Sequence, residues 1–181
     1  MTYQDDGRGT TPIAADGPKG IGGWMILPIL GLFGTLALTL YNMAQVFVQW
    51  HGMELIIEGS NDRLVALRLP TAISLVDGMS IVVLVPLCLY RIFTYSPAVP
   101  KLMTIFYVWL ILSAFGESYA DHAINDILGT PSTEGIFTSD LAHALVGAAI
   151  WIPYFWRSRR VANTFGLAEA RTRKQVGEIF S

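Results

Sequence analysis

Cysteine and charge are both scarce in this chain of 181 residues. The single cysteine, Cys88, lies inside an apolar run, so neither an intrachain disulfide framework nor a cysteine metal cluster can form. Charged residues make up only 14% of the sequence, against 52% apolar residues. The charges gather at the ends and in two connections, leaving runs of about 20 apolar residues, the length that a helix needs to cross a bilayer. The composition therefore predicts an integral membrane protein.

Several motifs of enzyme and cofactor chemistry are also missing. The sequence has no His-Glu-x-x-His metal motif and no glycine-rich phosphate loop after a strand. A bis-histidine haem needs histidines that face each other, and only His143 is well placed for this. Ser113 and His143 lack the supporting motif of an intramembrane serine protease. We therefore expect a non-catalytic protein with no cofactor, whose short basic tail favours anionic headgroups over nucleic acid.

The last apolar run, from Leu141 to Trp156, sets the predicted direction of the chain because it is followed directly by arginines. Basic residues at the end of a span favour the cytoplasmic side. Only Arg63 and Arg68 fall on the opposite side. The cytoplasmic set is Arg8, Lys19, Arg91, Lys101, Arg157, Arg159, Arg160, Arg171, Arg173 and Lys174. This asymmetry predicts an all-α, four-helix membrane bundle of two antiparallel transmembrane hairpins with both termini in the cytoplasm.

The chain divides into three predicted parts. They are a flexible cytoplasmic segment over residues 1–20, a membrane domain over 21–160 and a cytoplasmic amphipathic tail over 161–181. We place the spans at about 24–49, 71–90, 101–121 and 140–156, with a kink at Pro86. The connection over 51–70 fits either a short hairpin or an interfacial helix, and periodicity does not choose between them.

Three ionisable residues are predicted to lie inside the membrane. Counting helical rise from Arg91, Lys101 and Arg157 places Asp77, Glu117 and His143 about 21 to 24 Å above the cytoplasmic boundary. Such groups are costly in a bilayer unless they are paired or hydrated, so they mark a candidate site for a divalent metal or a proton relay. Ordinary hydrogen bonding in a wet outer mouth is the alternative explanation.

Two further sets of residues have predicted contacts. Ala144, Gly147 and Ala148 form a small-residue face that lets another helix pack closely, either the third span or another protein. A basic set is expected to contact anionic lipid headgroups, the last three of its members from the amphipathic tail. It consists of Arg157, Arg159, Arg160, Arg171, Arg173 and Lys174.

Three sequence segments together resemble the YdgK-like family of small bacterial inner-membrane proteins, a domain of unknown function. They are Gly20-Ile21-Gly22-Gly23-Trp24-Met25-Ile26-Leu27-Pro28, then Tyr95-Ser96-Pro97, and finally Ile150-Trp151-Ile152-Pro153-Tyr154-Phe155 with Ser158, Arg160, Val161, Thr164 and Phe165. The resemblance implies a four-helix protein of the bacterial inner membrane and no established reaction. No catalytic residue can therefore be carried over. The resemblance covers roughly residues 20–165.

The sequence leaves two functions open. The first is a non-catalytic accessory or interaction subunit, in contact with the lipid bilayer and with other integral membrane subunits. A bundle this small has most of its helical surface facing outward, which suits such a role. The second is a small oligomeric carrier that couples proton or metal movement to Asp77, Glu117 and His143.

Overall fold

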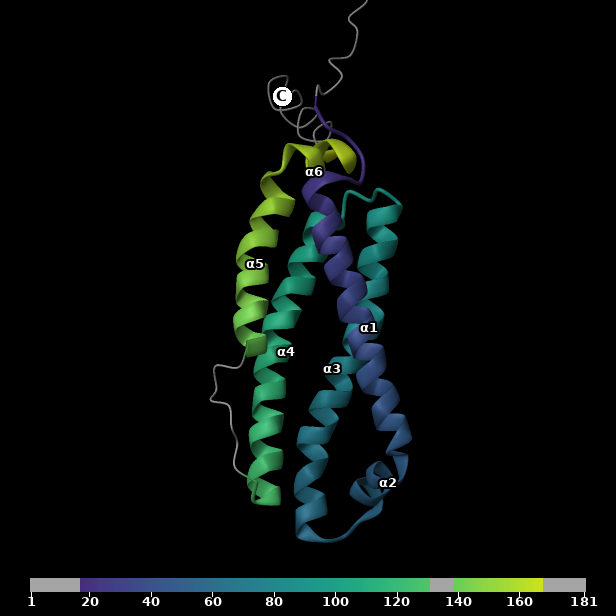
Figure 1. Ribbon diagram of the computed structural model, residues 1–181, viewed down its shortest axis with the longest axis vertical. Helices are drawn as coiled ribbons and strands as arrows, with labels where there is room; N and C mark the ends of the chain where they lie inside the picture. The colour runs from purple at the N-terminus through teal and green to yellow at the C-terminus, as the bar shows by residue number, and fades with distance from the viewer. Residues whose placement is uncertain (1–16, 131–138, 168–181) are drawn as a thin grey trace, which may run out of the picture.

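The computed structural model describes residues 17–130 and 139–167, and each element in these two ranges is helical. The elements are the single 3-10 turn Gly23–Met25, α1 (Ile26–Val48), α2 (Trp50–Glu58), α3 (Asp62–Phe93), α4 (Val99–Leu128), α5 (Ser139–Arg157) and α6 (Arg159–Thr164). Figure 1 shows α1, α3, α4 and α5 running lengthwise, with α2 at one end and α6 at the other. The all-α prediction is confirmed.

Three helices in the described residues are long and apolar enough to cross a membrane. They comprise Gly23–Val48, Asp62–Phe93 and Val99–Leu128. The 19-residue α5 is not among them. It carries a histidine, a proline and several interfacial aromatic residues, which lower its apolar character.

The connection after α1 forms a helix rather than a hairpin. Gln49 alone separates α1 from α2, and Arg68 on α3 holds the last turn of α2. The Arg68 guanidinium donates hydrogen bonds of 3.0, 2.8 and 2.7 Å to the carbonyl oxygens of Ile56, Ile57 and Gly59. Carbonyls at a helix C-terminus lack intrahelical partners, so these bonds satisfy them and fix α2 against α3.

The third helix is longer than its predicted membrane segment. α3 begins at Asp62, where the Asn61 side chain accepts a hydrogen bond of 3.2 Å from the backbone N–H of Arg63. Pro70, predicted to end the loop, is instead buried inside the helix. The Asn61 cap explains this earlier start, because a side chain that satisfies a free N–H stabilises the first turn.

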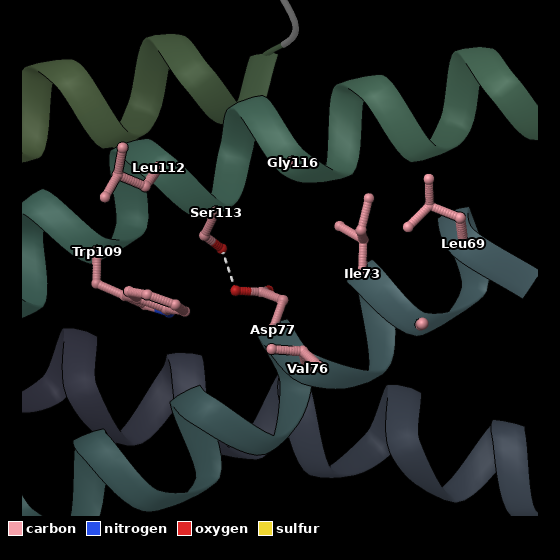
Figure 2. A pocket seen from close by; sticks show the side chains of 9 residues that line it. Leu69, Ile73, Val76, Asp77, Trp109, Leu112, Ser113 and Gly116 are labelled. Carbon is pink, nitrogen blue, oxygen red and sulfur yellow. Dashed lines mark hydrogen bonds between the residues drawn. The ribbon is translucent and has the colours of Figure 1, made fainter.

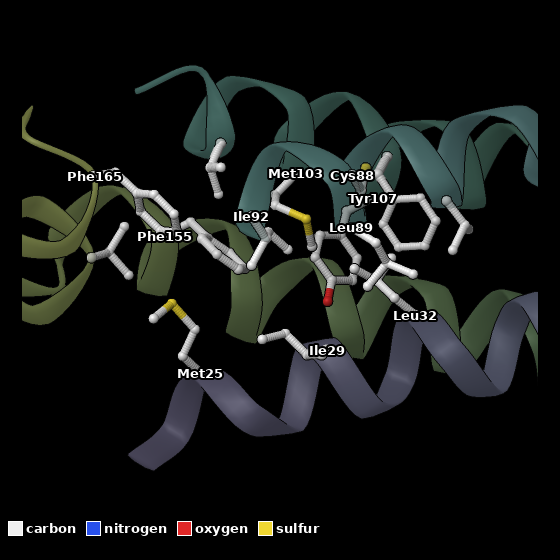
Figure 3. Packing of buried hydrophobic residues seen from close by; sticks show 14 of the residues in the cluster. Met25, Ile29, Leu32, Cys88, Leu89, Ile92, Met103, Tyr107, Phe155 and Phe165 are labelled. Atoms are coloured by element: carbon white, nitrogen blue, oxygen red, sulfur yellow. The ribbon is translucent and has the colours of Figure 1, made fainter. Parts of the chain in front are cut away.

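The main hydrophobic core lies toward the end that carries α6. Figure 3 shows Met25 and Ile29 of the first helical segment facing Ile92, Met103 and Phe155 from three other helices. Phe155 and Ile92 are almost completely buried. The connection between α3 and α4 is short, since α3 ends at Phe93 and α4 begins at Val99.

The first and last described segments meet over this core. The backbone N–H of Gly20 donates to the Thr164 hydroxyl at 3.0 Å, and that hydroxyl lies 3.4 Å from the Gly20 carbonyl oxygen. A side chain at Gly22 would have its Cβ 3.1 Å from the Arg160 guanidinium, so glycine permits this close approach. Val161 and Phe165 are buried below. Segments far apart in the sequence thus form one closed cap, which accounts physically for the glycines before α1.

Candidate functional site

A polar cavity of about 370 Å³ lies between five helices. α1 contributes Thr39, Asn42, Met43 and Val46, and α2 contributes Met53. The rest of the wall consists of Thr71, Ser74, Leu75, Asp77 and Gly78 of α3, Glu117 and Asp121 of α4, and Asp140 of α5. The lining holds four carboxylates and no lysine or arginine, so the cavity attracts cations.

Two crossed hydrogen bonds join α3 and α4 at this cavity. The Ser74 hydroxyl of α3 donates to Glu117 Oε2 of α4 at 2.9 Å. In the opposite sense, the Ser113 hydroxyl of α4 donates to Asp77 Oδ1 of α3. Each helix therefore supplies one serine and one carboxyl, three or four residues apart and so on one face. The two pairs fix both carboxyl groups at the contact between these helices.

α1 and α3 approach closely at the cavity wall. Gly78 of α3 faces α1, and a Cβ at that position would lie 3.5 Å from the Met43 side chain. Asp77, the neighbour of Gly78, is half-buried, whereas Asp121 and Asp140 are exposed. Asp77 and Glu117 are thus the enclosed carboxyls, and the other two lie where water and ions have access.

The structure places the three residues of the predicted metal site on two different surfaces. Asp77 and Glu117 line the same cavity, but His143 is exposed on α5 and is not part of the lining. Across residues 17–130 and 139–167, no group of three or more His, Cys, Asp or Glu side chains could hold a metal ion. Counting helical rise predicts how deep each of the three residues lies. It does not predict which side of the helix each side chain occupies. His143 points away because Leu141 and Ala144, which flank it, face the interior.

A second hollow lies on the outer side of α3 and α4, which we call the lateral groove. It consists of two adjoining apolar hollows of about 360 and 660 Å³ that share Val76 and Trp109. Figure 2 shows Asp77 and Ser113 pointing toward each other in the first of them. Asp77 therefore lines both the polar cavity and the lateral groove.

The small-residue face of α5 packs inside the chain. Ala144 and Ala148 are buried, and a Cβ on Gly147 would lie 3.6 Å from the Tyr107 ring of α4. Near the other end of the same interface, Trp156 Nε1 donates to the Thr104 hydroxyl at 2.8 Å. Of the two partners considered for this face, the internal one is therefore present.

The predicted basic residues lie only partly within the described chain. Arg157 and Arg159 are exposed at the junction of α5 and α6, and Arg160 is partly covered by the glycine segment. Arg171, Arg173 and Lys174 lie outside the described residues, as does most of the predicted amphipathic tail. The structure therefore leaves the lipid contacts of this set as a prediction.

The sequence did not point to Ser74, and Ser113 was paired with the wrong residue. Ser113 was considered only as a nucleophile beside His143, whereas its partner is Asp77. The available signal was spacing, because Ser74 precedes Asp77 by three residues and Ser113 precedes Glu117 by four. Serines on the same helix face as intramembrane carboxyls are natural hydrogen-bond partners across a helix contact.

These features define an all-helical protein with three helices able to span a membrane and an acidic cavity between them. The chain belongs to the family described as Protein of unknown function (DUF2569), whose model matches residues 18–166. No curated protein and no solved structure matches it. The family match begins and ends at the two segments that form the closed cap, so it includes the whole helical framework described here.

Proposed function

We propose that the chain is a YdgK-like member of its family with four spans, α5 being the fourth, in the bacterial inner membrane with both termini in the cytoplasm. The distribution of charge supports this orientation. The end that carries α6 holds Lys19, Arg91, Lys101, Arg157, Arg159 and Arg160, with no Asp or Glu among its described residues. All described carboxylates belong to α2, α3, α4 or the beginning of α5, and basic ends favour the cytoplasm.

We infer that this protein is a small, non-catalytic carrier that couples cation movement to protons. The carboxylate-lined cavity is the observation that carries this proposal. Ionisable groups at membrane depth are costly and mark ion or proton pathways. Glu117 is held by Ser74 at the contact of α3 and α4, and Asp121 of the same helix leads to the exposed side of the cavity. Proton exchange at these carboxyl groups is the coupled step of the proposal.

The coupling rests on competition at Glu117. As a carboxylate, Glu117 accepts the Ser74 hydrogen bond and attracts a cation into the cavity. A proton on the same carboxyl cancels its negative charge, so the cation loses its main attraction and leaves. Asp77 is fixed in the same way by Ser113 and shares the wall. Proton and cation therefore exchange at one group rather than move together.

The Glu117→Gln variant tests the carrier. We expect purified wild-type protein in liposomes to dissipate an imposed pH gradient when a carried cation is added, and Glu117→Gln to abolish that signal because the amide cannot exchange a proton. A trapped pH-sensitive dye reports the gradient across a panel of alkali, divalent and organic cations. Asp126→Asn is the matched control, since Asp126 is an exposed carboxyl on α4 outside the cavity lining.

Two results would count against the carrier. One is wild-type protein that behaves like empty liposomes with every cation in the panel. The other is a Glu117→Gln variant as active as wild type, which would show that the Glu117 carboxyl in the cavity is not needed for transport. Loss of activity in both Glu117→Gln and Asp126→Asn would indicate a general effect of surface charge instead.

An accessory subunit is the second candidate, favoured by the outer face of α1. Gly31 and Gly34 are exposed on this helix, and a Cβ at either would meet nothing within 4 Å. Exposed glycines three residues apart allow another transmembrane helix to approach closely. The chain itself fills its other small-residue face, on α5, so α1 is the surface left for a different membrane subunit.

Leucine substitutions separate folding from partner binding. We expect Gly34→Leu to leave the isolated protein stable, because the new side chain points into open space, and to remove any stoichiometric partner. Gly147→Leu is the matched variant and should destabilise the chain itself by about 1 to 3 kcal/mol through overpacking against Tyr107. Gentle purification with mass spectrometry measures the partner, and thermal unfolding in detergent measures stability. A complex that survives Gly34→Leu would contradict the accessory role of α1.

The arginines at the junction of α5 and α6 are expected to contact lipid, whichever of the two functions the protein has. Arg157 and Arg159 are exposed where α5 meets α6, next to no described carboxylate. Phosphate groups of anionic lipids suit arginine because they accept paired hydrogen bonds from its guanidinium. We propose that these arginines, with Arg160 and the basic residues of the tail, contact cytoplasmic headgroups.

A further inference from the structure

His143 is a polar side chain placed in an apolar, outward-facing stripe. On α5 it shares the exposed face with Val146 and Ile150, which are 59% and 55% exposed, at a spacing of three and seven residues. The described residues give it no hydrogen bond or ion pair. An imidazole facing hydrocarbon is unfavourable, so a polar partner for His143 would lower its cost.

The level of His143 along the bundle matches that of Asp77. Leu141 and Ala144, on either side of His143, pack against Ala114 of α4. Ala114 follows Ser113, whose hydroxyl donates to Asp77. Within one chain, however, His143 and the lateral groove lie on different sides of α4, because its Ala114 face meets α5 and its Ser113 face meets α3.

We propose that the lateral groove binds α5 of a second copy of this chain, with His143 of that copy donating a hydrogen bond to the carboxylate of Asp77. Charge complementarity selects this occupant. Asp77 is an enclosed carboxyl in a largely apolar groove, where the Ser113 hydroxyl donates a hydrogen bond to it. The imidazole of His143 is a polar group at the same level, exposed on α5 and without a hydrogen bond among the described residues.

The register of the two helices supports the fit. Figure 1 shows that α3 and α5 both run from the α2 end toward the α6 end, so two copies inserted in the same orientation align them in parallel. His143 opposite Asp77 places Ile150 opposite Leu84, because each pair is separated by seven residues, about 10 Å of helix. Leu84 and its neighbour Val83 line the second part of the groove, so the apolar stripe meets apolar walls.

The groove and the α5 stripe are different surfaces, so the contact is head-to-tail. Such contacts continue from copy to copy and close into a ring when the rotation permits. Each Asp77 then receives a hydrogen bond from a histidine of the neighbouring copy. The contact does not depend on transport, so it stands or falls separately from the carrier proposal.

Cysteine crosslinking in native membranes tests the contact. In a Cys88→Ala background, one tagged copy carries Ile150→Cys and a differently tagged copy carries Val83→Cys, leaving His143 and Asp77 intact. Both positions are exposed in the single chain. After mild oxidation we expect a mixed dimer carrying both tags. Ile150→Cys with Leu38→Cys is the control pair, because Leu38 lies on the exposed face of α1.

The polar pair is tested in the same assay. His143→Leu in the Ile150→Cys copy keeps the helix face apolar and should lower the mixed-dimer yield by about three- to tenfold, the effect of one lost interhelical hydrogen bond. Asp77→Asn in the other copy should lower it less, since the amide oxygen still accepts. A yield no higher than that of the control pair would overturn the docking, with lipid left in the groove. A yield unchanged by His143→Leu would overturn the proposed pair.

Discussion

Phe155→Ala is expected to lower the free energy of unfolding by about 3 kcal/mol, at the lower end of the range for large core residues. Phe155 is 1% exposed and lies at the contact of α5 with α1, α3 and α4 below the closed cap. In a membrane, the hydrophobic effect contributes little to this loss of stability, because lipid is as apolar as the core. The cost is therefore mainly the cavity and the packing contacts that disappear with it.

The control for Phe155→Ala is the same substitution on a lipid-facing surface. Phe33 on α1 is 49% exposed, so Phe33→Ala opens no internal cavity and should change stability by much less than 1 kcal/mol. Thermal unfolding of both variants in one detergent, followed by tryptophan fluorescence, makes the comparison. Equal losses would mean that the core near α6 does not hold the helices together, and the closed cap would lose its stabilising role.

The helical framework was predictable because its signals are local. Runs of apolar residues between charged connections gave the all-α class, and the gap between the predicted spans 71–90 and 101–121 gave the connection between α3 and α4. Segment ends were less predictable, since Pro70 normally breaks a helix but is buried here inside α3. A capped N-terminus eight residues earlier outweighs that preference.

The sequence predicted how deep the residues of the candidate site lie, but not which way their side chains point. Helical rise placed Asp77, Glu117 and His143 at one level, and the structure puts the first two on one cavity. His143 points outward because the positions beside it, Leu141 and Ala144, are the ones that α4 covers. Which face a neighbour covers is a tertiary property, so no count along one helix could have excluded His143.

The closed cap shows a different limit of local reasoning. The glycines before α1 and Thr164 belong to the segments that carry the family resemblance, and the sequence alone predicted no contact between them. Their reason is a contact between the two ends of the matched region, where Gly20 bonds Thr164 and Arg160 lies over Gly22. The motifs of the first and last segments are therefore one structural feature, divided in sequence by the whole membrane domain.

Gly59→Ala is expected to displace α2 and destabilise the protein by about 1 to 3 kcal/mol or more. A Cβ on Gly59 would lie 2.5 Å from the backbone oxygen of Leu55, which cannot move without unwinding the last turn of α2. The Gly59 carbonyl oxygen also accepts a hydrogen bond from Arg68, so a shifted backbone weakens the attachment of α2 to α3. Because Met53 of α2 lines the acidic cavity, the same change should make the cavity more accessible to water.

Gly52→Ala provides the matched control within the same helix. A Cβ at Gly52 would meet nothing within 4 Å, and alanine favours a helix over glycine by about 0.5 to 1 kcal/mol, so this variant should be neutral or slightly more stable. Hydrogen exchange of α2 and thermal unfolding compare the two variants in detergent. Faster exchange in α2 for Gly59→Ala alone would support its role as the close-packed joint between α2 and α3. Equal behaviour of the two variants would show that α2 is not held by this joint, and its place beside the cavity would then depend on the membrane surface instead.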